Sequence, residues 1–396
     1  MKILYCLFQS IRADFLERTR RYSFLITLGV MIYLGYLAVP AADAGVLTVD
    51  IGNLRGVYNT AWIGSITTLL STLLFSIPGF YLVKNTLSRD RRTRVGQIIA
   101  STPLSNMTYI LGKTLSNFIY LAAVTLLMMA AAGVMQFVRS EVLAFHVKEL
   151  VLPYVLITLP VMLIVSAAAV LFETLPLLRD GFGNLVYFAL WLVVVIASMS
   201  GVHFGAQGVI QEPVNDLFGA SLVGYSMHQA ASAAFPERKL DFGVGYTRVE
   251  NEIGTFPWDG VDWSWQIGMV RLLWAGVGLV IAGAAVLLFD RFDPAREKPG
   301  PEEENPASAL LNRLRDISLP RLRFPADKKA PLPPFLRLVF SEVKLSLKGQ
   351  PWWWYLAAAG LMIAGLSAAD YGSLKGIWLA TWIWPVLIWS SSGVRE

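Results

Sequence analysis

The sequence predicts an all-α, polytopic membrane protein with about eight transmembrane helices, six in a first half and two at the start of a second. Hydrophobic residues make up 55% of the 396 residues and charged residues only 15%, and the apolar residues gather in runs long enough to cross a bilayer. The cations are divided unevenly among the segments between these runs, as is typical of membrane proteins. Two of the runs follow amphipathic segments, which we expect to form helices on the membrane surface.

The first surface helix is expected at residues 1–21. Apolar residues recur there at helical spacing, namely Leu4, Leu7, Phe8, Ile11 and Phe15, and charged residues occupy the rest of the turn. Six spans should follow, at about residues 22–39, 61–83, 108–138, 150–172, 184–200 and 265–289. Pro153 and Pro160 are expected to kink the fourth span, as membrane helices tolerate.

The Lys and Arg residues place both ends of the first half, residues 1–293, on the cytoplasmic side of the cell inner (plasma) membrane, with the N-terminus inside. The segments assigned to that side hold 25 of the 33 Lys and Arg residues, and the external loops hold seven, which is the bias that the positive-inside rule describes. Trp258, Trp263 and Trp265 stand where an aromatic belt should mark the outer start of the sixth span.

Residues 294–334 are expected to form a cytoplasmic linker, because the stretch from Asp290 to Pro334 carries nine prolines and many charges. Residues 335–396 then repeat the order in which the chain begins, with a surface helix and spans near residues 352–369 and 377–392. This second repeat is apparently truncated at Glu396, where the first copy enters its charged segment. We therefore expect the reading frame to continue with about four more spans.

The most informative segment lies between the second and third spans. It begins with the charged run from Arg89 to Arg94, continues with the helix-forming residues 95–101 and ends at Thr102-Pro103, which would cap or stop a short helix. Five Lys or Arg residues between Lys84 and Arg94 assign it to the cytoplasm. The cations alone would suffice to orient the neighbouring helices. Orientation does not require a short helix with a defined end, so we expect a rigid unit that a cytoplasmic partner can move.

With Gly112-Lys113 at the foot of the third span, this segment resembles that of the integral membrane permeases of ABC exporters of the second (ABC-2) class. Asp290-Arg291-Phe292-Asp293-Pro294 after the sixth span belongs to the same resemblance, which covers residues 1–293 in topology and recurs weakly in residues 335–396. The resemblance implies an export permease whose ATP and Mg are bound by a partner ABC ATP-binding subunit, present as two copies or a dimer. It implies an ATPase-coupling segment made of Arg89, Asp90, Arg91, Arg92, Arg94, Gln97, Thr102 and Pro103. Many relatives carry a glutamate where this chain has Gln97.

Three charged residues stand near or within the predicted spans. Lys113 is expected to snorkel to the interface. Gly112-Lys113-Thr114 is not a P-loop, because Met107 occupies the position of the first glycine of that motif. Glu173 and Arg271 are candidates for buried functional charges by their depth, although pairing or snorkelling would explain them as well.

Other classes of protein find little support. The net charge of +5 is divided by side of the membrane, so it indicates contact with membrane lipids and not with nucleic acid. Cys6 is the one cysteine, and His146, His203 and His228 lack metal-ligand spacing, so neither a disulfide nor a metal site is expected. The spans hold no paired aspartates, zinc-binding His-Glu helix or serine with a base, so we expect a non-catalytic chain with no cofactor of its own.

The external segment, residues 201–264, leaves two interpretations open. It carries eight acidic and three basic residues, and its alanine-rich part from Gly219 to Phe235 could form short helices that cap a transport path. An ordinary solvated loop would have a similar composition. The alternative function for the whole chain is a membrane anchor or assembly protein, including a permease-like domain in a longer permease-peptidase fusion.

Overall fold

A computed structural model describes residues 2–292, apart from residues 21, 43, 140, 143, 180, 201–215, 239 and 250–252, together with residues 359, 360 and 362. The chain divides into two units, Met1–Asp293 and Pro294–Glu396. The expected linker, second surface helix and last two spans belong to the second unit. Apart from residues 359, 360 and 362, which are helical, they lie outside the described residues.

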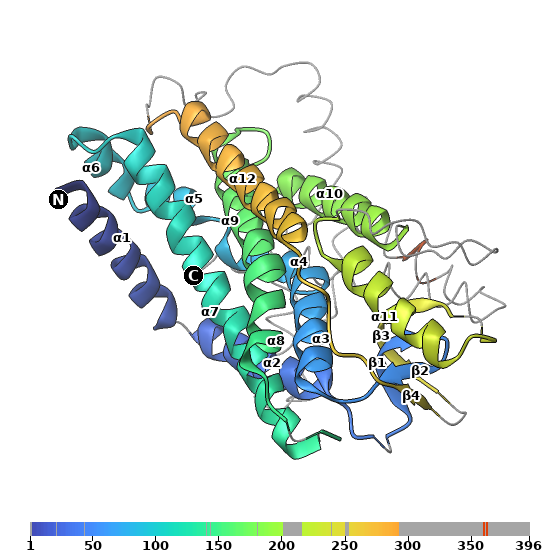
Figure 1. The fold of residues 1–396 in the computed structure, drawn as a ribbon. Helices are drawn as coiled ribbons and strands as arrows, with labels where there is room; N and C mark the ends of the chain where they lie inside the picture. Colours follow the sequence, from blue (N-terminus) through green and yellow to red (C-terminus); the bar gives the residue numbers. More distant parts are fainter. Residues whose placement is uncertain are drawn as a thin grey trace, which may run out of the picture. The chain divides into compact units, whose positions relative to one another are not determined.

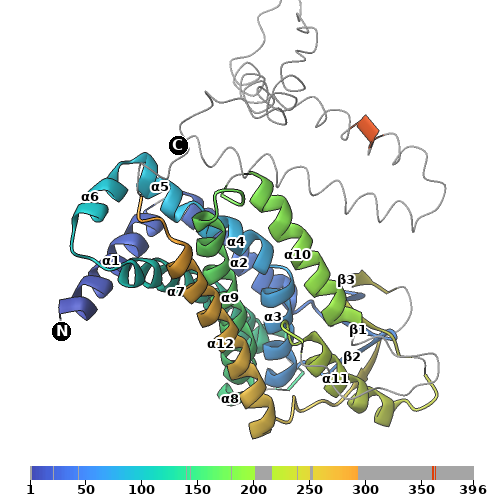
Figure 2. The ribbon, with the colours of Figure 1, turned by 90° about the horizontal axis from the view of Figure 1, so that it is seen from above.

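Helices dominate the first unit (Figure 1). They are α1 (Lys2–Thr19), α2 (Tyr22–Ala38), α3 (Thr60–Leu73), α4 (Ser76–Val83), α5 (Thr86–Arg92), α6 (Val95–Ser101), α7 (Asn106–Arg139), α8 (Val147–Pro153), α9 (Leu159–Thr174), α10 (Gly181–Ser200), α11 (Ala220–Ala234) and α12 (Trp265–Leu288). The strands are β1 (Val46–Ile51), β2 (Leu54–Gly56), β3 (Phe242–Arg248) and β4 (Gly254–Phe256). Two views place α5 and α6 at one end of the helical bundle and the strands with α11 at the other (Figure 1 and Figure 2). We call these the α6 end and the sheet end.

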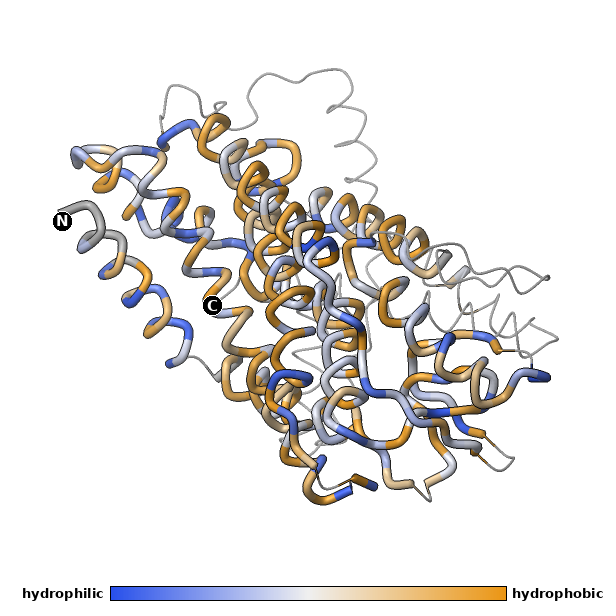
Figure 3. The backbone as a smooth tube through the Cα atoms, in the orientation of Figure 1, coloured by the Kyte–Doolittle hydropathy of each residue, from blue (hydrophilic) through white to orange (hydrophobic). Residues whose placement is uncertain are grey.

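Four helical stretches of the described chain are long and apolar enough to cross a membrane: Asn106–Arg139, Val147–Thr174, Gly181–Met199 and Trp265–Leu288. Two bent helix pairs raise the number to six if each counts as one span, Ile11–Thr19 with Phe24–Ala38 and Thr60–Leu73 with Ser76–Arg92. Hydrophobic residues cover most of the long helices, and hydrophilic ones gather near both ends of the bundle (Figure 3). These features are compatible with a polytopic α-helical membrane protein.

The second predicted span is not one straight helix. It is broken into α3 and α4, and the pair Thr60–Leu73 and Ser76–Arg92 is bent by 53°. Pro78 lies in the first turn of α4, and a proline both lacks an N–H donor and clashes with the carbonyl group four residues earlier, here that of Leu74. The helix therefore ends before Leu74 and starts again after Phe75.

The two prolines of the fourth predicted span do not break it into separate helices. A five-residue π-helix, η1 (Tyr154–Thr158), joins α8 to α9 between Pro153 and Pro160. A π-turn uses hydrogen bonds one residue longer than those of an α-helix, so it absorbs the misfit that the prolines cause. Val147–Thr174 remains one 28-residue helical stretch.

The strands correct the all-α prediction. They lie in segments that were expected to be external loops: β1 pairs antiparallel with β3, and β2 pairs parallel with β4. Val46 stands opposite Arg248 and Ile51 opposite Phe242. Trp62 of α3 joins this region to the bundle, because its ring meets the ring of Phe256 edge-on at 5.9 Å.

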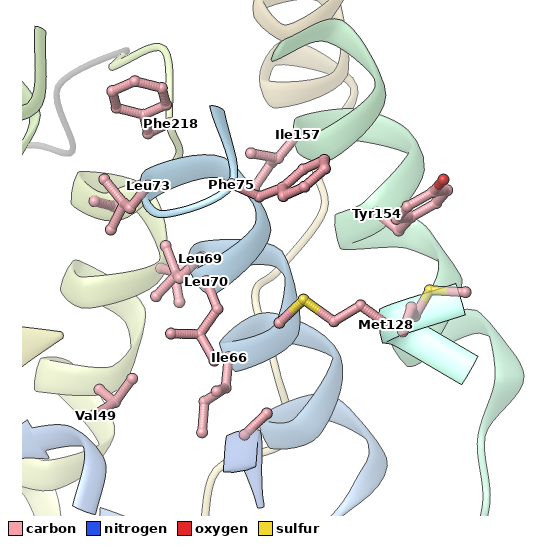
Figure 4. Packing of buried hydrophobic residues seen from close by; sticks show 14 of the residues in the cluster. Val49, Ile66, Leu69, Leu70, Leu73, Phe75, Met128, Tyr154, Ile157 and Phe218 are labelled. Carbon is pink, nitrogen blue, oxygen red and sulfur yellow. The ribbon is translucent and has the colours of Figure 1, made fainter. Parts of the chain in front are cut away.

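Helix α3 is at the centre of the core. All 14 of its residues are buried. Figure 4 shows Ile66, Leu69, Leu70 and Leu73 of α3 facing residues of the surrounding elements, among them Met128, Tyr154, Ile157 and Phe218. The threonines and serines of α3 remain compatible with burial since their hydroxyls find acceptors, as Thr67 does at the Ile63 carbonyl, 2.6 Å away.

Candidate functional site

The predicted coupling segment forms two short helices, α5 and α6, at the α6 end. Helix α6 spans Val95–Ser101, where a helix was expected. Arg94, between the two helices, adopts a left-handed conformation with φ of 60°, which interrupts the helical path between α5 and α6. Helix α6 ends because Thr102 is extended (φ −86°, ψ 159°), as the residue before a proline prefers to be. The charged start of the predicted segment, Arg89 to Arg92, forms the last four residues of α5.

Glu173 holds the start of α5 against the end of α9. Its Oε1 accepts a hydrogen bond from the backbone N–H of Thr86 at 3.0 Å, and its Oε2 accepts one from Ser88 at 2.9 Å. The side chain is fully buried. A carboxylate at a helix N-terminus satisfies N–H groups that the helix cannot, and it also interacts favourably with the helix dipole. The buried charge predicted from depth is thus accounted for by a local contact with the coupling segment.

A buried ionic cluster joins α1, α5 and α7. Lys113 Nζ lies 3.1 Å from Asp14 Oδ1 and 3.0 Å from Asp90 Oδ2. Asp90 also accepts a hydrogen bond from the Tyr109 hydroxyl at 2.7 Å, and Arg89 Nη2 lies 3.6 Å from Asp14 Oδ1. The prediction that Lys113 snorkels is therefore wrong, since its side chain is only 6% exposed. Two carboxylates offset the cost of removing its charge from water.

Helix α1 turns charged residues inward. Asp14 and Arg18 are both buried against the bundle, and Arg18 donates hydrogen bonds to Thr86 Oγ1, at 3.0 Å, and to Asn117 Oδ1. Only a membrane-facing role was expected of α1, so these two residues were missed as part of the site. Their spacing of four residues, which puts opposite charges on one side of a helix, was the available signal.

The residues that directly follow α12 contact the other side of the α5–α6 pair. Arg91 Nη2 donates to Asp290 Oδ1 at 2.8 Å, and Arg291 Nη2 donates to the Thr102 carbonyl at 2.8 Å. The ring of Phe292 lies on Gly96 so closely that an added Cβ would come within 2.8 Å of it. Gly96 is therefore required for this contact.

The predicted segment divides into an inner and an outer part. Arg89, Asp90 and Arg91 face the bundle through the contacts above. The outer residues are exposed and comprise Arg92, Arg94, Gln97 and Pro103, with Thr102 half-buried. Two apolar side chains of α6 stand among them, Ile98 at 66% exposure and Val95 at 41%. The α5–α6 pair thus presents a mixed outer face, with the basic Arg92 and Arg94 beside the apolar Val95 and Ile98 of α6.

Arg271 lies at the opposite end of α12 from this site. It is 2% exposed, and its Nη1 donates to the backbone carbonyl of Asp216 at 2.6 Å. Seventeen residues of helix separate it from Leu288, the last residue of α12, which is roughly 26 Å along the axis. The two predicted buried charges therefore belong to different regions, since Glu173 contacts α5 at the α6 end.

Metal-binding geometry is not found in the described part of the chain, where no group of three His, Cys, Asp or Glu side chains could hold an ion. His203 falls within residues 201–215, outside the described residues. No protein-family profile matches the sequence, and no curated protein matches it.

Proposed function

We propose that this chain is the permease subunit of an ABC exporter, embedded in the inner membrane with its N-terminus and α6 end in the cytoplasm. A separate ATP-binding subunit, present as two copies or a dimer, docks on α6. That partner binds ATP and Mg and performs the hydrolysis. This chain supplies the transmembrane path and is not itself an enzyme.

The observation that carries the proposal is the contrast between the two faces of the α5–α6 pair. The side chains of its outer face are exposed. Its inner face is held by Glu173 at the start of α5, by the Lys113 cluster and by the Arg91 to Asp290 ion pair. These contacts lead to α9, to α1 and α7, and to α12. Because packed elements move as rigid units, a push on α6 would reach all of them.

The chemistry of the outer face also suits a protein partner. Arg92 and Arg94 can pair with carboxylates at the rim of an interface, and the exposed Ile98 can enter an apolar pocket. A loop whose cations served only to orient neighbouring helices would need none of the inward contacts, so the topogenic interpretation leaves them unexplained. A simple anchor would likewise gain nothing from fixing the α5–α6 pair to four other helices.

The first test is whether a reading frame beside that of this chain encodes a Walker-motif ATPase. That protein is then tested for co-purification with this chain, followed by ATPase assays in lipid nanodiscs. Arg92→Gln combined with Arg94→Gln, and separately Ile98→Asp, should each reduce ATPase binding about tenfold or more. Arg248→Gln at the sheet end is the matched control and should leave binding unchanged, since Arg248 is also an exposed cation. Unchanged binding and ATPase activity in both variants of the α5–α6 pair would overturn the proposal.

A further inference from the structure

The start of α11 penetrates the helical bundle. Thr72 of α3 donates a hydrogen bond to the Phe218 carbonyl at 3.1 Å, and Ser221 of α11 donates to the Ser198 carbonyl of α10 at 3.1 Å. Gly219 lies against η1, since a Cβ on it would come within 2.6 Å of the Ile157 side chain. Phe218 is 3% exposed, and Figure 4 shows it beside Leu73 of α3.

The start of α11 reaches deep into the bundle, although residues 201–264 were predicted to be external. Helix α3 starts at Thr60 at the sheet end, and Thr72 is 12 residues further along. At 1.5 Å per residue, Phe218 therefore lies roughly 18 Å below the start of α3. That distance is more than half the thickness of the hydrocarbon core of a bilayer.

Arg271 of α12 contacts Asp216, just before the start of α11. Its Nη1 donates to the Asp216 carbonyl at 2.6 Å, and its Nη2 lies 3.9 Å from Asp216 Oδ1. The other carboxylate oxygen, Oδ2, accepts from the N–H of Ala220, the first residue of α11, at 2.8 Å. One arginine thus fixes the residue that in turn orients the start of α11.

The ion pair is buried but only loosely matched. Side chains of Arg271 and Asp216 are 2% and 3% exposed, yet Asp216 Oδ1 and Arg271 Nε have no hydrogen-bond partner among the described residues. By contrast, Arg55 and Glu141 form a two-pronged pair with distances of 2.7 and 2.6 Å. A buried pair with unsatisfied atoms gains less from its attraction than it loses in desolvation. Movement of this segment into water would hydrate both side chains and recover their desolvation cost, so the pair does not require the segment to stay in place.

We infer that residues 216–221 form a removable plug that closes the sheet end of the bundle and is held in place by the Arg271 to Asp216 ion pair. Only the purpose of the plug, to close the outer end of a transport path, rests on the proposed function. The insertion of residues 216–221 and the ion pair that holds them are properties of this chain alone, so they can be tested without an ATPase.

The experiment measures cysteine labelling of the purified full chain in nanodiscs, with Cys6 replaced by serine. A cysteine at Ser221, which is 1% exposed, should react with a hydrophilic maleimide about tenfold or more slowly than one at Ala234, at the exposed end of the same helix. Arg271→Gln should raise the rate at Ser221 about tenfold and leave that at Ala234 unchanged. Arg271→Lys, which keeps the charge, should label at Ser221 more slowly than Arg271→Gln.

Each result decides a separate point. An unchanged rate at Ala234 and an unchanged elution volume establish that Arg271→Gln still folds. Fast labelling of Ser221 in the parent chain would overturn the plug. An equal rate for Arg271→Gln and its parent, or for Arg271→Lys and Arg271→Gln, would overturn the ionic latch. Slow labelling at Ser221 in a chain that binds no ATPase would contradict the proposed function but not the plug.

Discussion

Lys113 of α7 and Asp14 of α1 form a buried ion pair, with Nζ 3.1 Å from both carboxylate oxygens, although 99 residues separate them in the sequence. The same ammonium group meets Asp90 of α5. One cation therefore joins the first helix of the chain to the segment that carries α6. A change in the position of α6 cannot be independent of α1 while this cluster is intact.

Lys113→Met should destabilise the first unit by about 3–5 kcal/mol, because it leaves two carboxylates buried with one cation fewer. The measurement is the free energy of unfolding of the purified chain in detergent. Lys148→Met is the control, since Lys148 is exposed at the sheet end, and its effect should stay within about 0.5 kcal/mol. Adding Asp14→Asn to Lys113→Met should recover part of the loss. Equal stability of Lys113→Met and the parent would contradict the ionic cluster.

Glu173→Gln should loosen the start of α5. The amide side chain offers one acceptor oxygen where the carboxylate offers two, so one of the N–H groups of Thr86 and Ser88 loses its partner. The expected cost is about 1–3 kcal/mol, and it should appear as faster hydrogen exchange in a peptide that covers residues 84–93. Glu149→Gln, at the sheet end, should leave exchange in that peptide as it is. Equal protection in both variants would show that Glu173 does not hold α5.

Gly96→Val should displace Phe292 and weaken the contact between α6 and the end of α12. The added atoms would overlap the Phe292 ring, whose nearest atoms lie 2.8 Å from the position that a Cβ on Gly96 would take, and overpacking of this kind costs about 1–3 kcal/mol. Coupled ATPase activity should fall with stability. Gly112→Ala is the matched control because nothing lies within 4 Å of its added Cβ. Adding Phe292→Ala to Gly96→Val should recover part of the lost stability. If it does not, overlap with the Phe292 ring is not the cause of the loss.

Glu141 should make the stability of the sheet end depend on pH. The hydrogen bonds from Arg55 lower the pKa of Glu141 below its ordinary value of 4.5. Its contribution is therefore fully present above about pH 4.5 and is lost as the pH falls through the lowered folded-state pKa. The difference in unfolding midpoint between the parent and Glu141→Gln should be largest at neutral pH and shrink below pH 4.5. A difference that does not vary with pH would rule out the ion pair as its source.

Cysteine labelling in intact cells should establish the orientation. In a chain with Cys6→Ser, a cysteine at Ala234 should react with a membrane-impermeant reagent from outside. One at Ser101, exposed at the end of α6, should react only after lysis. Labelling of both positions in intact cells would contradict the proposed topology.

The long apolar helices of residues 2–292 were largely predictable because hydropathy is a local property of the chain. Helix α7 begins at Asn106 and α12 at Trp265, close to the expected positions 108 and 265, since an apolar run of bilayer length has few other stable conformations. The end of α6 was equally local, because Pro103 restricts the residue before it. Pro78 carried a similar signal for the break after α3, and the prediction of one straight span overlooked it.

By itself, then, the sequence determined the apolar helices, the charge asymmetry and the short helix that ends at Thr102-Pro103. Only the tertiary structure decided which distant groups meet: Val46 with Arg248 across the sheet, Asp14 with Lys113, and Asp216 with Arg271. The physical reason is that pairing and burial depend on distances in space. The 80° turn between the α1 and α2 segments brings Asp14 to α7, and the insertion of α11 brings Asp216 to α12. No pattern within one segment contains that information.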